Sequence, residues 1–383
     1  MGDFHQFPPV GRPLSALYCP PSPTRTTSAV GRALFEQFDT VINLTVQNRI
    51  QDEVWKDLLQ RLRGKFAFQM SNLLYSLPLT EGECTKEDVS ELKKLMLNEN
   101  EDEQLDFEQE PWSDAVLVTP RNSVRAAWNK AALRKHCDRT GHTLYDAPAE
   151  DSVGSESKPC DMWQREAVSK LREKFAGGVP HRLELAIGMK AMVTFNTATE
   201  ADLANGSRGT VEGITLDPRE PSLARDEKTG VVKLKFPPAM ILFKPLQGSV
   251  AKFPGFPEGF IPTFPREKSF TITHQGNQKT SVKRRQHAMV AAYAFTDHKA
   301  QGQTLEYAII DIAPTKKFPV DSFSAYVALS RGRGRNKIRI LRNFNELIFT
   351  KHPSEYLRLE DERLLRVAEE TKEKFEAGYY NFA

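Results

Sequence analysis

The sequence predicts an α/β fold that is interrupted by a β-rich insertion. Short apolar runs typical of buried strands, at 115–119, 307–312 and 337–341, alternate with segments of helical periodicity. Between 183 and 285, by contrast, β-favouring runs are separated by Gly, Pro and Asn-Gly turns. A small barrel or sheet inserted into an α/β domain explains both patterns.

The first 110 residues are expected to supply loops and helices. Residues 1–40 are rich in Pro, Ser, Thr and Gly and predict mostly loop, and 42–45 predicts a short strand. Four apolar residues then fall on one face of a helix that Gly64 can end: Trp55, Leu58, Leu59 and Leu62. Thr85 and Asp88 have the spacing of a capping box before a second helix.

The elements after residue 110 complete the pattern. The first apolar strand leads through 120–122 into a helix, and 146–160 predicts a polar loop. After the insertion we expect an alanine-rich helix from 288 and a helix over 321–330. Ser354 is the expected N-cap of a final amphipathic helix.

Composition places the chain among globular proteins. Its 383 residues suggest two or three domains, and 39% hydrophobic and 27% charged residues are ordinary values for such proteins. No apolar stretch approaches the roughly 18 residues of a membrane span, and no signal peptide is visible. The four cysteines form no CxxC pair, so we expect reduced thiols in an intracellular protein and no metal site.

The net charge of +3 hides two blocks of opposite sign. Residues 281–342 hold twelve Lys or Arg against four Asp or Glu, a local excess of +8. Residues 81–110 hold twelve acidic against three basic side chains, a local excess of −9. We interpret the acidic run at 98–110 as a solvated linker, whereas the basic block predicts a polyanionic partner, because crowded cations repel each other unless a polyanion screens them.

Several motifs occur in a fixed order along the chain. Two near the C-terminus carry the most information: TDHKAQGQTLE at 296–306 and YVALSRGR at 326–333. The others are GDFHQFPPV at 2–10, INLTVQNRIQD at 42–52, AVLVTPRNSVRAAWN at 115–129, LAIGMKAMVTFN at 185–196 with LANGSRGTVEGI at 203–214, and VKRRQHAMV at 282–290.

In this order the motifs resemble the RecD-like and PIF-type (petite integration frequency) branch of superfamily 1 DNA helicases, including those carried by rolling-circle transposons. The resemblance implies an α/β RecA-like P-loop helicase domain with an inserted SH3-like β-barrel, behind a truncated first RecA-like domain. It divides the chain into a remnant of the first RecA-like domain (1–40), a helical connector with an acidic linker (41–110), the second RecA-like domain in two parts (111–182 and 286–350), the inserted barrel (183–285) and a C-terminal helix (351–383).

The resemblance assigns five residues to ATP. Arg331 matches the arginine finger, Arg49 a second contact to the γ-phosphate, and Gln6 the glutamine that senses this phosphate. Gln301 and Gly302 match a turn that couples nucleotide to DNA. Guanidinium groups suit this task because ATP hydrolysis builds negative charge on phosphoryl oxygens. Each arginine alone also allows a plainer interpretation, Arg331 as part of a basic tail and Arg49 as a surface side chain.

The resemblance also assigns residues to single-stranded DNA. They are Thr296, His298 and Lys299 in one motif, Thr119, Pro120 and Asn122 in another, and Asn205 and Arg208 in the insertion. Donors suit the phosphates and flat faces suit the bases. Structural alternatives stay open: His298 as a structural histidine, Asn122 as a helix cap, and Asn205-Gly206 as a plain hairpin turn.

The departures from the family concern catalysis. The chain contains no G-x-x-x-x-G-K-[ST] loop, and no acidic pair precedes GDFHQFPPV. ATP and Mg²⁺, which the intact family uses, are therefore not expected to bind tightly to this chain alone, and we expect no ATPase activity from it. Ala300 and His287-Ala288 are milder departures.

Three functions stay open. The preferred one is the C-terminal portion of a 5′-to-3′ DNA helicase, truncated or transposon-derived; the alternatives are a non-catalytic single-stranded DNA-binding module and a protein-interaction remnant. The expected partners are single-stranded DNA and a missing N-terminal helicase half, with no membrane. We expect a monomer located in the nucleus, with the mitochondrion as the alternative.

Overall fold

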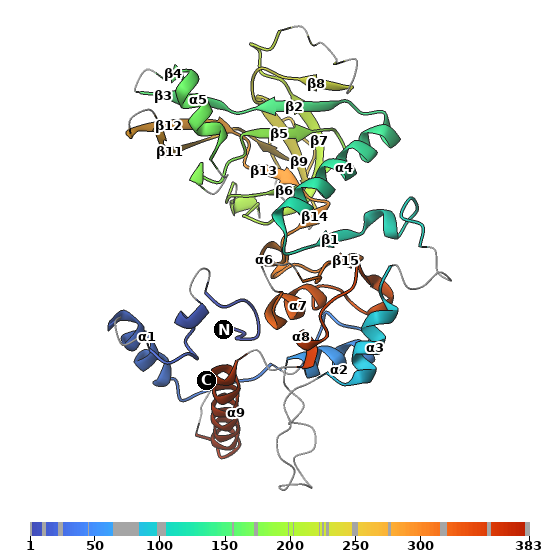
Figure 1. Cartoon of the computed structure of the whole chain (residues 1–383), viewed down its shortest axis with the longest axis vertical. Coiled ribbons are helices and arrows are strands. Elements are labelled where there is room, and N and C mark those ends of the chain that lie inside the picture. The colour runs from blue at the N-terminus through green and yellow to red at the C-terminus, as the bar shows by residue number, and fades with distance from the viewer. Residues whose placement is uncertain are drawn as a thin grey trace. The chain divides into compact units, whose positions relative to one another are not determined.

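A parallel sheet joins strands that are far apart in the sequence (Figure 1). Strands β1 (Val116–Val118), β15 (Ala308–Ile310) and β16 (Ile338–Ile340) pair in parallel, and β14 (Ala294–Phe295) lies on the other side of β1. All three residues of β1 and of β15 are buried, as continuous apolar runs in a covered parallel sheet should be. The predicted α/β class is confirmed.

The computed structural model describes most of the chain. The described residues are 2–9, 13–21, 26–44, 46–63, 84–97, 105–154, 157–171, 175–197, 199–201, 203–221, 223, 226, 230–246, 252–274, 277–314, 320–350 and 354–379. The predicted helix end at Gly64 and residues 98–104 of the acidic run lie outside them.

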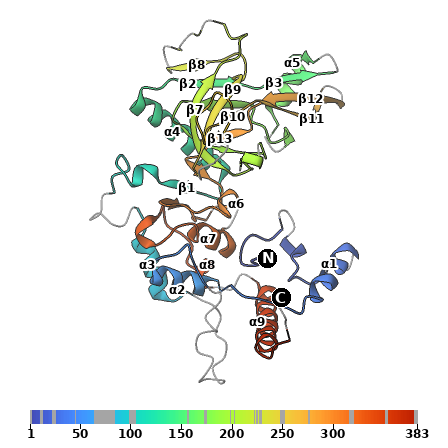
Figure 2. The ribbon, with the colours of Figure 1, turned by 180° about the vertical axis from the view of Figure 1, so that it is seen from behind.

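Short helices accompany the parallel sheet. Figures 1 and 2 show α2 (Glu53–Leu62), α3 (Lys86–Lys94), α7 (Ser322–Leu329) and α8 (Leu347–Thr350) beside it. The four apolar residues predicted for α2 are buried, and its N-cap Asp52 accepts a hydrogen bond of 3.2 Å from the amide of Trp55. The predicted capping box of α3 is formed by Thr85 and Asp88. Local patterns therefore place these helices correctly.

The N-terminal segment differs from prediction. It contains a 3₁₀ turn (Pro13–Ser15) and a helix, α1 (Thr26–Glu36), where mostly loop was predicted. An i,i+4 ion pair between Arg32 and Glu36 supports α1. The predicted strand at 42–45 is wrong for its described part, 42–44, because these residues pair with no strand and Ile42 and Leu44 are exposed.

The final helix, α9 (Glu355–Glu376), begins after Ser354 as predicted. Arg32 of α1 forms an ion pair of 3.1 Å with Glu360 of α9, and His5 contacts Asp361 at 2.7 Å. Leu357, near the start of this helix, is fully buried, whereas Phe375, near its end, is exposed. Ion pairs as well as apolar packing therefore hold α9 against the N-terminal segment.

The chain forms two compact units, residues 1–122 with 295–383, and residues 123–294. The first contains the parallel sheet and the helices above, together with α6 (Asp297–Ala300) and the 3₁₀ turns Trp112–Asp114 and Arg335–Lys337. The six-segment division expected from the sequence is finer than these units and stays a prediction. Among the described residues, every helix is too short or too polar to cross a bilayer.

The second unit is mainly antiparallel β-structure. It contains the helices α4 (Asn122–Thr140) and α5 (Met162–Ser169), the 3₁₀ turn Thr199–Ala201, and the strands β2 (Leu144–Pro148), β3 (Glu150–Val153), β4 (Lys158–Pro159), β5 (Arg182–Leu185), β6 (Lys190–Val193), β7 (Arg208–Thr215), β8 (Val231–Lys233), β9 (Met240–Pro245), β10 (Ile261–Thr263), β11 (Arg266–His274), β12 (Gln278–Gln286) and β13 (Met289–Ala291). The sheet orders are β10-β9-β7-β6-β13, β11-β12-β3-β4 and β5-β2-β8. The β-rich insertion is confirmed, while its SH3-like character stays a prediction.

Two sequence predictions in the second unit are wrong. The polar loop at 146–160 contains β3 and β4, because the acidic residues Glu150 and Asp151 stand directly opposite Arg285 and Arg284 of β12 and form ion pairs with them. The alanine-rich helix from 288 is instead β13 and β14, because β13 pairs with β6. In both places a distant strand overrides local preference.

Candidate functional site

Arg331 follows α7 and is almost completely buried, with 2% of its surface exposed. Its guanidinium donates hydrogen bonds to the carbonyl oxygens of Val327 (2.7 Å) and Gln303 (3.4 Å) and to the Ser330 hydroxyl (2.6 Å). These acceptors are neutral, and no carboxylate of the described residues forms an ion pair with it. A buried cation without a counter-ion is costly for a fold and indicates a function.

Arg49 lies beside the same turn and is half-buried. It donates to the carbonyl oxygen of Ser330 and to the hydroxyl of Thr304, both at 3.1 Å. Burial and then the nearby charge of Arg49 lower the pKa of Arg331 to about 10, and burial lowers the pKa of Arg49. A buried guanidinium whose positive charge is disfavoured by burial and by a neighbouring cation is a favourable place for an anion.

Gln6 and Gln301 meet in the structure, although 295 positions separate them. The Gln301 side-chain amide donates to the Gln6 side-chain oxygen at 2.9 Å. Gly302 has a φ of +81°, and a Cβ there would meet nothing within 4 Å, so the turn needs glycine for its backbone conformation and not for space. The Leu305 amide then donates to the Arg331 carbonyl oxygen at 2.9 Å. The turn therefore connects the glutamine pair to Arg331.

Asp3 is a site residue that the sequence analysis missed. Its carboxylate accepts hydrogen bonds from the Arg63 guanidinium (2.9 Å), the His5 amide (3.1 Å) and the Gln6 side chain (3.3 Å). The Asp3 carboxylate therefore positions the Gln6 side chain, and the Arg63 guanidinium balances its negative charge. Its position within GDFHQFPPV, the motif that contains Gln6, is the signal that could have identified it.

The residues predicted for DNA in the TDHKAQG motif lie on α6. Thr296 is its N-cap residue, and His298 and Lys299 are exposed. The ring of His298 lies over the ring of Phe7, with 4.0 Å between centroids and 36° between planes. Phe7 was not predicted, and an aromatic residue next to Gln6 was the available signal. The two rings therefore contact each other at the surface of this unit, in a tilted arrangement.

Thr119 is fully buried rather than presented to solvent. Its hydroxyl donates to the Asp311 carboxylate at 2.8 Å, and Arg121 and Arg342 form ion pairs of 2.5 Å and 2.8 Å with the same group. Burial alone would raise the pKa of Asp311, but these donors outweigh it and lower the pKa. Neither arginine was predicted as a site residue. Pro120 is half-buried, and Asn122 is exposed at the start of α4.

Asn205 and Arg208 belong to the second unit. Asn205 is exposed in a turn with Gly206, whose φ is +97°. The backbone amide of Asn205 donates to the Asn196 side-chain oxygen at 3.0 Å. Arg208 begins β7, and burial lowers its pKa. The predicted turn is confirmed, and a DNA contact from this turn stays a prediction.

The described residues contain no group of three or more His, Cys, Asp or Glu that could hold a metal ion. His136 and His142, which lie near Cys137 in the sequence, both contact the carbonyl oxygen of Ile187 at 2.9 Å. All four cysteines are buried free thiols.

No protein-family model matches the sequence, and no curated protein matches it. Solved structures do. The Pif1 helicase from Candida albicans matches with a TM-score of 0.50 and 18% identity, over 84% of this chain and 60% of that one. A Bacteroides Pif1 bound to ssDNA matches with a TM-score of 0.50 and 16% identity, over 95% and 65% respectively. The chain thus spans under two thirds of these relatives' length and has the fold of that part of them.

Proposed function

We propose that this chain, which has the fold of Pif1 helicases, is the part of an ATP-dependent 5′-to-3′ DNA helicase that binds single-stranded DNA and supplies arginines to ATP. A nuclear location and a monomeric state belong to the proposal. The observation that carries it is the pair Arg331 and Arg49, two neighbouring guanidinium groups whose described partners are neutral oxygens.

The donor set fits a phosphate group better than a carboxylate of the protein. Arg49 is half-buried, so a ligand can reach it. Arg331 is almost completely buried, and its charge, which acts on Arg49, would also act on an anion bound there. ATP, when bound, would supply the phosphoryl group whose transfer to water drives translocation. The arginines would bind its γ-phosphate oxygens and stabilise the charge that develops there.

A continuous set of contacts can connect this anion site to a DNA strand. Gln6 contacts Gln301, and the turn that follows Gln301 is hydrogen-bonded to Arg331. The same turn follows α6, which presents His298 and Lys299 at its surface. The stacked rings of Phe7 and His298 can receive a base, and Lys299 can receive a phosphate. In the Bacteroides relative the ligand named is ssDNA.

The chain's own residues do not complete an ATPase. Its sequence has no phosphate-binding loop of the G-x-x-x-x-G-K-[ST] type, which cradles the phosphates of ATP where it occurs. Binding and positioning are therefore the steps that this polypeptide can perform. We expect the purified chain to bind single strands but to hydrolyse no ATP, with or without DNA.

The test compares the purified wild type with three variants for binding to a labelled thymidine oligonucleotide, at salt concentrations between about 50 and 200 mM. Arg331→Met should bind as the wild type does. Lys299→Gln should bind more weakly, and the slope of log K against log salt should fall by about 0.7, the value for one phosphate contact on a single strand.

The matched control is Lys372→Gln on α9, which removes the same charge from an exposed lysine. Equal weakening by Lys299→Gln and the control would refute the predicted strand contact. Loss of binding in Arg331→Met would assign this arginine to DNA instead of nucleotide. ATP turnover by the wild-type chain that disappears in Arg331→Met would overturn the proposal that this chain binds and positions but does not hydrolyse ATP.

A further inference from the structure

Tyr326 belongs to the motif YVALSRGR but was not predicted as a site residue. It lies on α7, one turn before Ser330 and Arg331, and 8% of its surface is exposed. Its carbonyl oxygen accepts a hydrogen bond of 2.9 Å from the Ser330 amide, which continues the helix into the turn of Arg331. Its hydroxyl forms no hydrogen bond with a described residue. Because a buried phenol hydroxyl usually finds a partner, this one needs an explanation.

The Tyr326 hydroxyl is unpartnered but not sealed off. Some side-chain atoms of the described residues are fully enclosed without a hydrogen bond, such as Trp55 Nε1, and the Tyr326 oxygen is not one of them. By contrast, the hydroxyl of Tyr293 in the second unit accepts a hydrogen bond of 3.2 Å from the Lys190 amide. A ligand can therefore contact Tyr326 without displacing a partner within the described part of the chain.

Four charged side chains act on this hydroxyl. Burial raises the pKa of Tyr326, the Arg63 charge lowers this pKa and the Asp3 charge raises it. The charges of Arg331 and Arg49 also lower the pKa of Tyr326. Because the net result is a raised pKa, the hydroxyl keeps its proton at neutral pH and can donate it in a hydrogen bond.

The four charged groups form two pairs with different tasks. Arg49 and Arg331 are the neighbouring guanidinium groups at the proposed anion site. Asp3 and Arg63 form an ion pair of 2.9 Å, and the Asp3 carboxylate also positions Gln6. The Tyr326 hydroxyl is within electrostatic reach of both pairs. It therefore lies close to the groups to which sequence resemblance assigned the γ-phosphate.

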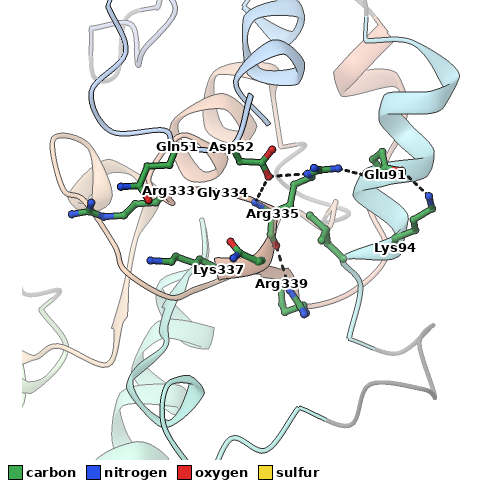
Figure 3. Close-up of a pocket in the computed structure, with 11 residues that line it drawn as sticks. Gln51, Asp52, Glu91, Lys94, Arg333, Gly334, Arg335, Lys337 and Arg339 are labelled. Atoms are coloured by element: carbon green, nitrogen blue, oxygen red, sulfur yellow. Dashed lines mark hydrogen bonds and ion pairs between the residues drawn. The ribbon is translucent and has the colours of Figure 1, made fainter. Parts of the chain in front are cut away.

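The chain segments that carry the two arginines of the anion site are fastened together just beyond them (Figure 3). The Gln51 amide donates to the Arg333 carbonyl oxygen at 3.0 Å. The Arg335 side chain forms ion pairs with Asp52 at 2.8 Å and with Glu91 at 3.2 Å, which the dashed lines in Figure 3 mark. Groups that are held in position before a ligand arrives bind it at a lower entropic cost.

We propose that the Tyr326 hydroxyl is a third ligand of the anion bound by Arg49 and Arg331, and that it donates a hydrogen bond to a phosphate oxygen. This inference deepens the proposed function and rests on it, since the anion is the γ-phosphate proposed there. A neutral hydroxyl adds a directional contact at a place where the two arginines would repel a third cation. A hydroxyl with a purely structural role would instead be paired within the protein.

The test removes the hydroxyl alone, with Tyr326→Phe. The matched control is Tyr18→Phe in the same unit, because Tyr18 is 7% exposed and the neighbouring groups that act on its pKa are Cys19 and Asp321. Arg331→Met reports on the arginine pair. The double variant Tyr326→Phe with Arg331→Met shows whether both side chains bind the same ligand.

The probe is inorganic pyrophosphate, and its affinity is measured by calorimetry. Tyr326→Phe should weaken binding about tenfold relative to Tyr18→Phe, since a hydrogen bond to a charged group contributes about this much. Arg331→Met should also weaken binding. Adding Tyr326→Phe to Arg331→Met should change the affinity little, because the two side chains act on one anion.

Urea unfolding separates a ligand contact from a structural one. Tyr326→Phe should leave the midpoint unchanged or raise it, because no hydrogen bond of the folded protein is lost. A midpoint at lower urea concentration would assign the hydroxyl to the fold and overturn the inference.

The binding data also separate this inference from the proposed function. Equal affinities of Tyr326→Phe and Tyr18→Phe, together with weaker binding by Arg331→Met, would overturn the inference and leave the proposed function intact. Unchanged binding by Arg331→Met, or no binding of pyrophosphate by the wild type, would overturn the proposed anion site and the inference with it.

Discussion

Among the residues that the structure describes, each of the two compact units buries one arginine almost completely, and the surroundings of the two arginines differ. Arg284 in the second unit is 1% exposed and forms two hydrogen bonds with the Asp151 carboxylate, at 2.7 and 2.8 Å. Its guanidinium also lies 5.1 Å from the ring centre of Phe270. Arg331 in the first unit is 2% exposed, and its described partners are two carbonyl oxygens and a hydroxyl.

This difference is the reason why we propose a structural role for Arg284 and a functional one for Arg331. Arg284 joins β12 to β3, and its charge is matched inside the protein, so the β-rich unit needs no ligand to stabilise it. Arg331 keeps a positive charge unmatched, and Arg49 adds a second one beside it. A fold tolerates this arrangement at a cost in stability where an external anion is to be bound.

The largest expected change in stability follows from replacing Arg284, the arginine that is paired with a carboxylate. Arg284→Met should lower the free energy of unfolding by about 3–5 kcal/mol, because it leaves the nearly buried Asp151 carboxylate without its counter-ion. Urea unfolding, read as a shift of midpoint at constant m-value, measures it.

The double variant Arg284→Met with Asp151→Leu is the control for this prediction. It removes both charges and should recover most of the lost stability, since no unpaired carboxylate is left behind. A loss of less than about 1 kcal/mol in the single variant would show that the pair is weak, and the contrast with Arg331 would then lose its basis.

A second prediction concerns the one buried histidine of the β-rich unit, His287. One ring nitrogen (Nε2) hydrogen-bonds the Pro238 carbonyl oxygen at 2.9 Å, and the other (Nδ1) is buried without a partner among the described residues. Burial, assisted by the charge of Arg285, lowers its pKa to about 4. The folded state therefore keeps this ring neutral while the unfolded chain binds a proton below about pH 6.5.

Stability that is fully present above pH 6.5 should accordingly fall as the pH drops towards 4, by up to about 3 kcal/mol. His287→Phe fills the same space with a ring that cannot titrate and should flatten this part of the pH profile. His142→Gln, at an exposed position, is the control and should leave the profile unchanged. A profile equally steep in His287→Phe and the wild type would assign the pH dependence to other groups.

The contrast between the units also separates what the sequence could predict from what it could not. Helix α2 and the capping box of α3 were predicted correctly because their signals lie within one or two turns of chain. Strand β3 was missed because Glu150 and Asp151 are polar, and the arginines that make them a strand lie more than 130 positions away.

The candidate site shows the same limit. The motifs singled out Gln6, Gln301 and Arg331, since resemblance transfers residue types along a sequence. The contacts of Asp3 and of Phe7 were not predictable, because Arg63 and His298 reach them only through the fold. The ion pairs of Arg335 with Asp52 and Glu91 were not predictable for a related reason, because an alternation of basic residues looks like a solvated segment until its partners are known.

A third prediction concerns Arg331, whose replacement should not lower the free energy of unfolding as that of Arg284 does. Arg331→Met should leave the free energy of unfolding unchanged or raise it by about 1 kcal/mol, because it removes a buried cation that has no counter-ion and that Arg49 repels. The same urea series that reports on Arg284→Met measures it. Destabilisation by more than about 2 kcal/mol would place Arg331 with Arg284 among the structural arginines.

The smallest expected effect belongs to the contact between Gln6 and Gln301. Both side chains are at least partly exposed, so the 2.9 Å hydrogen bond should contribute less than about 1 kcal/mol to stability. If its task is to transmit the state of the anion site to the strand, it should matter for coupling instead. The test is a double-mutant cycle of Gln6→Ala and Gln301→Ala. The free energy of unfolding is measured in urea, and the affinity for an oligonucleotide is measured with and without pyrophosphate.

In that cycle the wild type should bind the oligonucleotide differently when pyrophosphate is present, and either single variant should remove the difference. The double variant should then add nothing further, because the two residues act through one contact. Independent, additive losses from the two substitutions would show that each glutamine serves its own neighbours, Asp3 for Gln6 and the glycine turn for Gln301. The first unit would in that case hold an anion site and a strand surface with no connection between them through this pair.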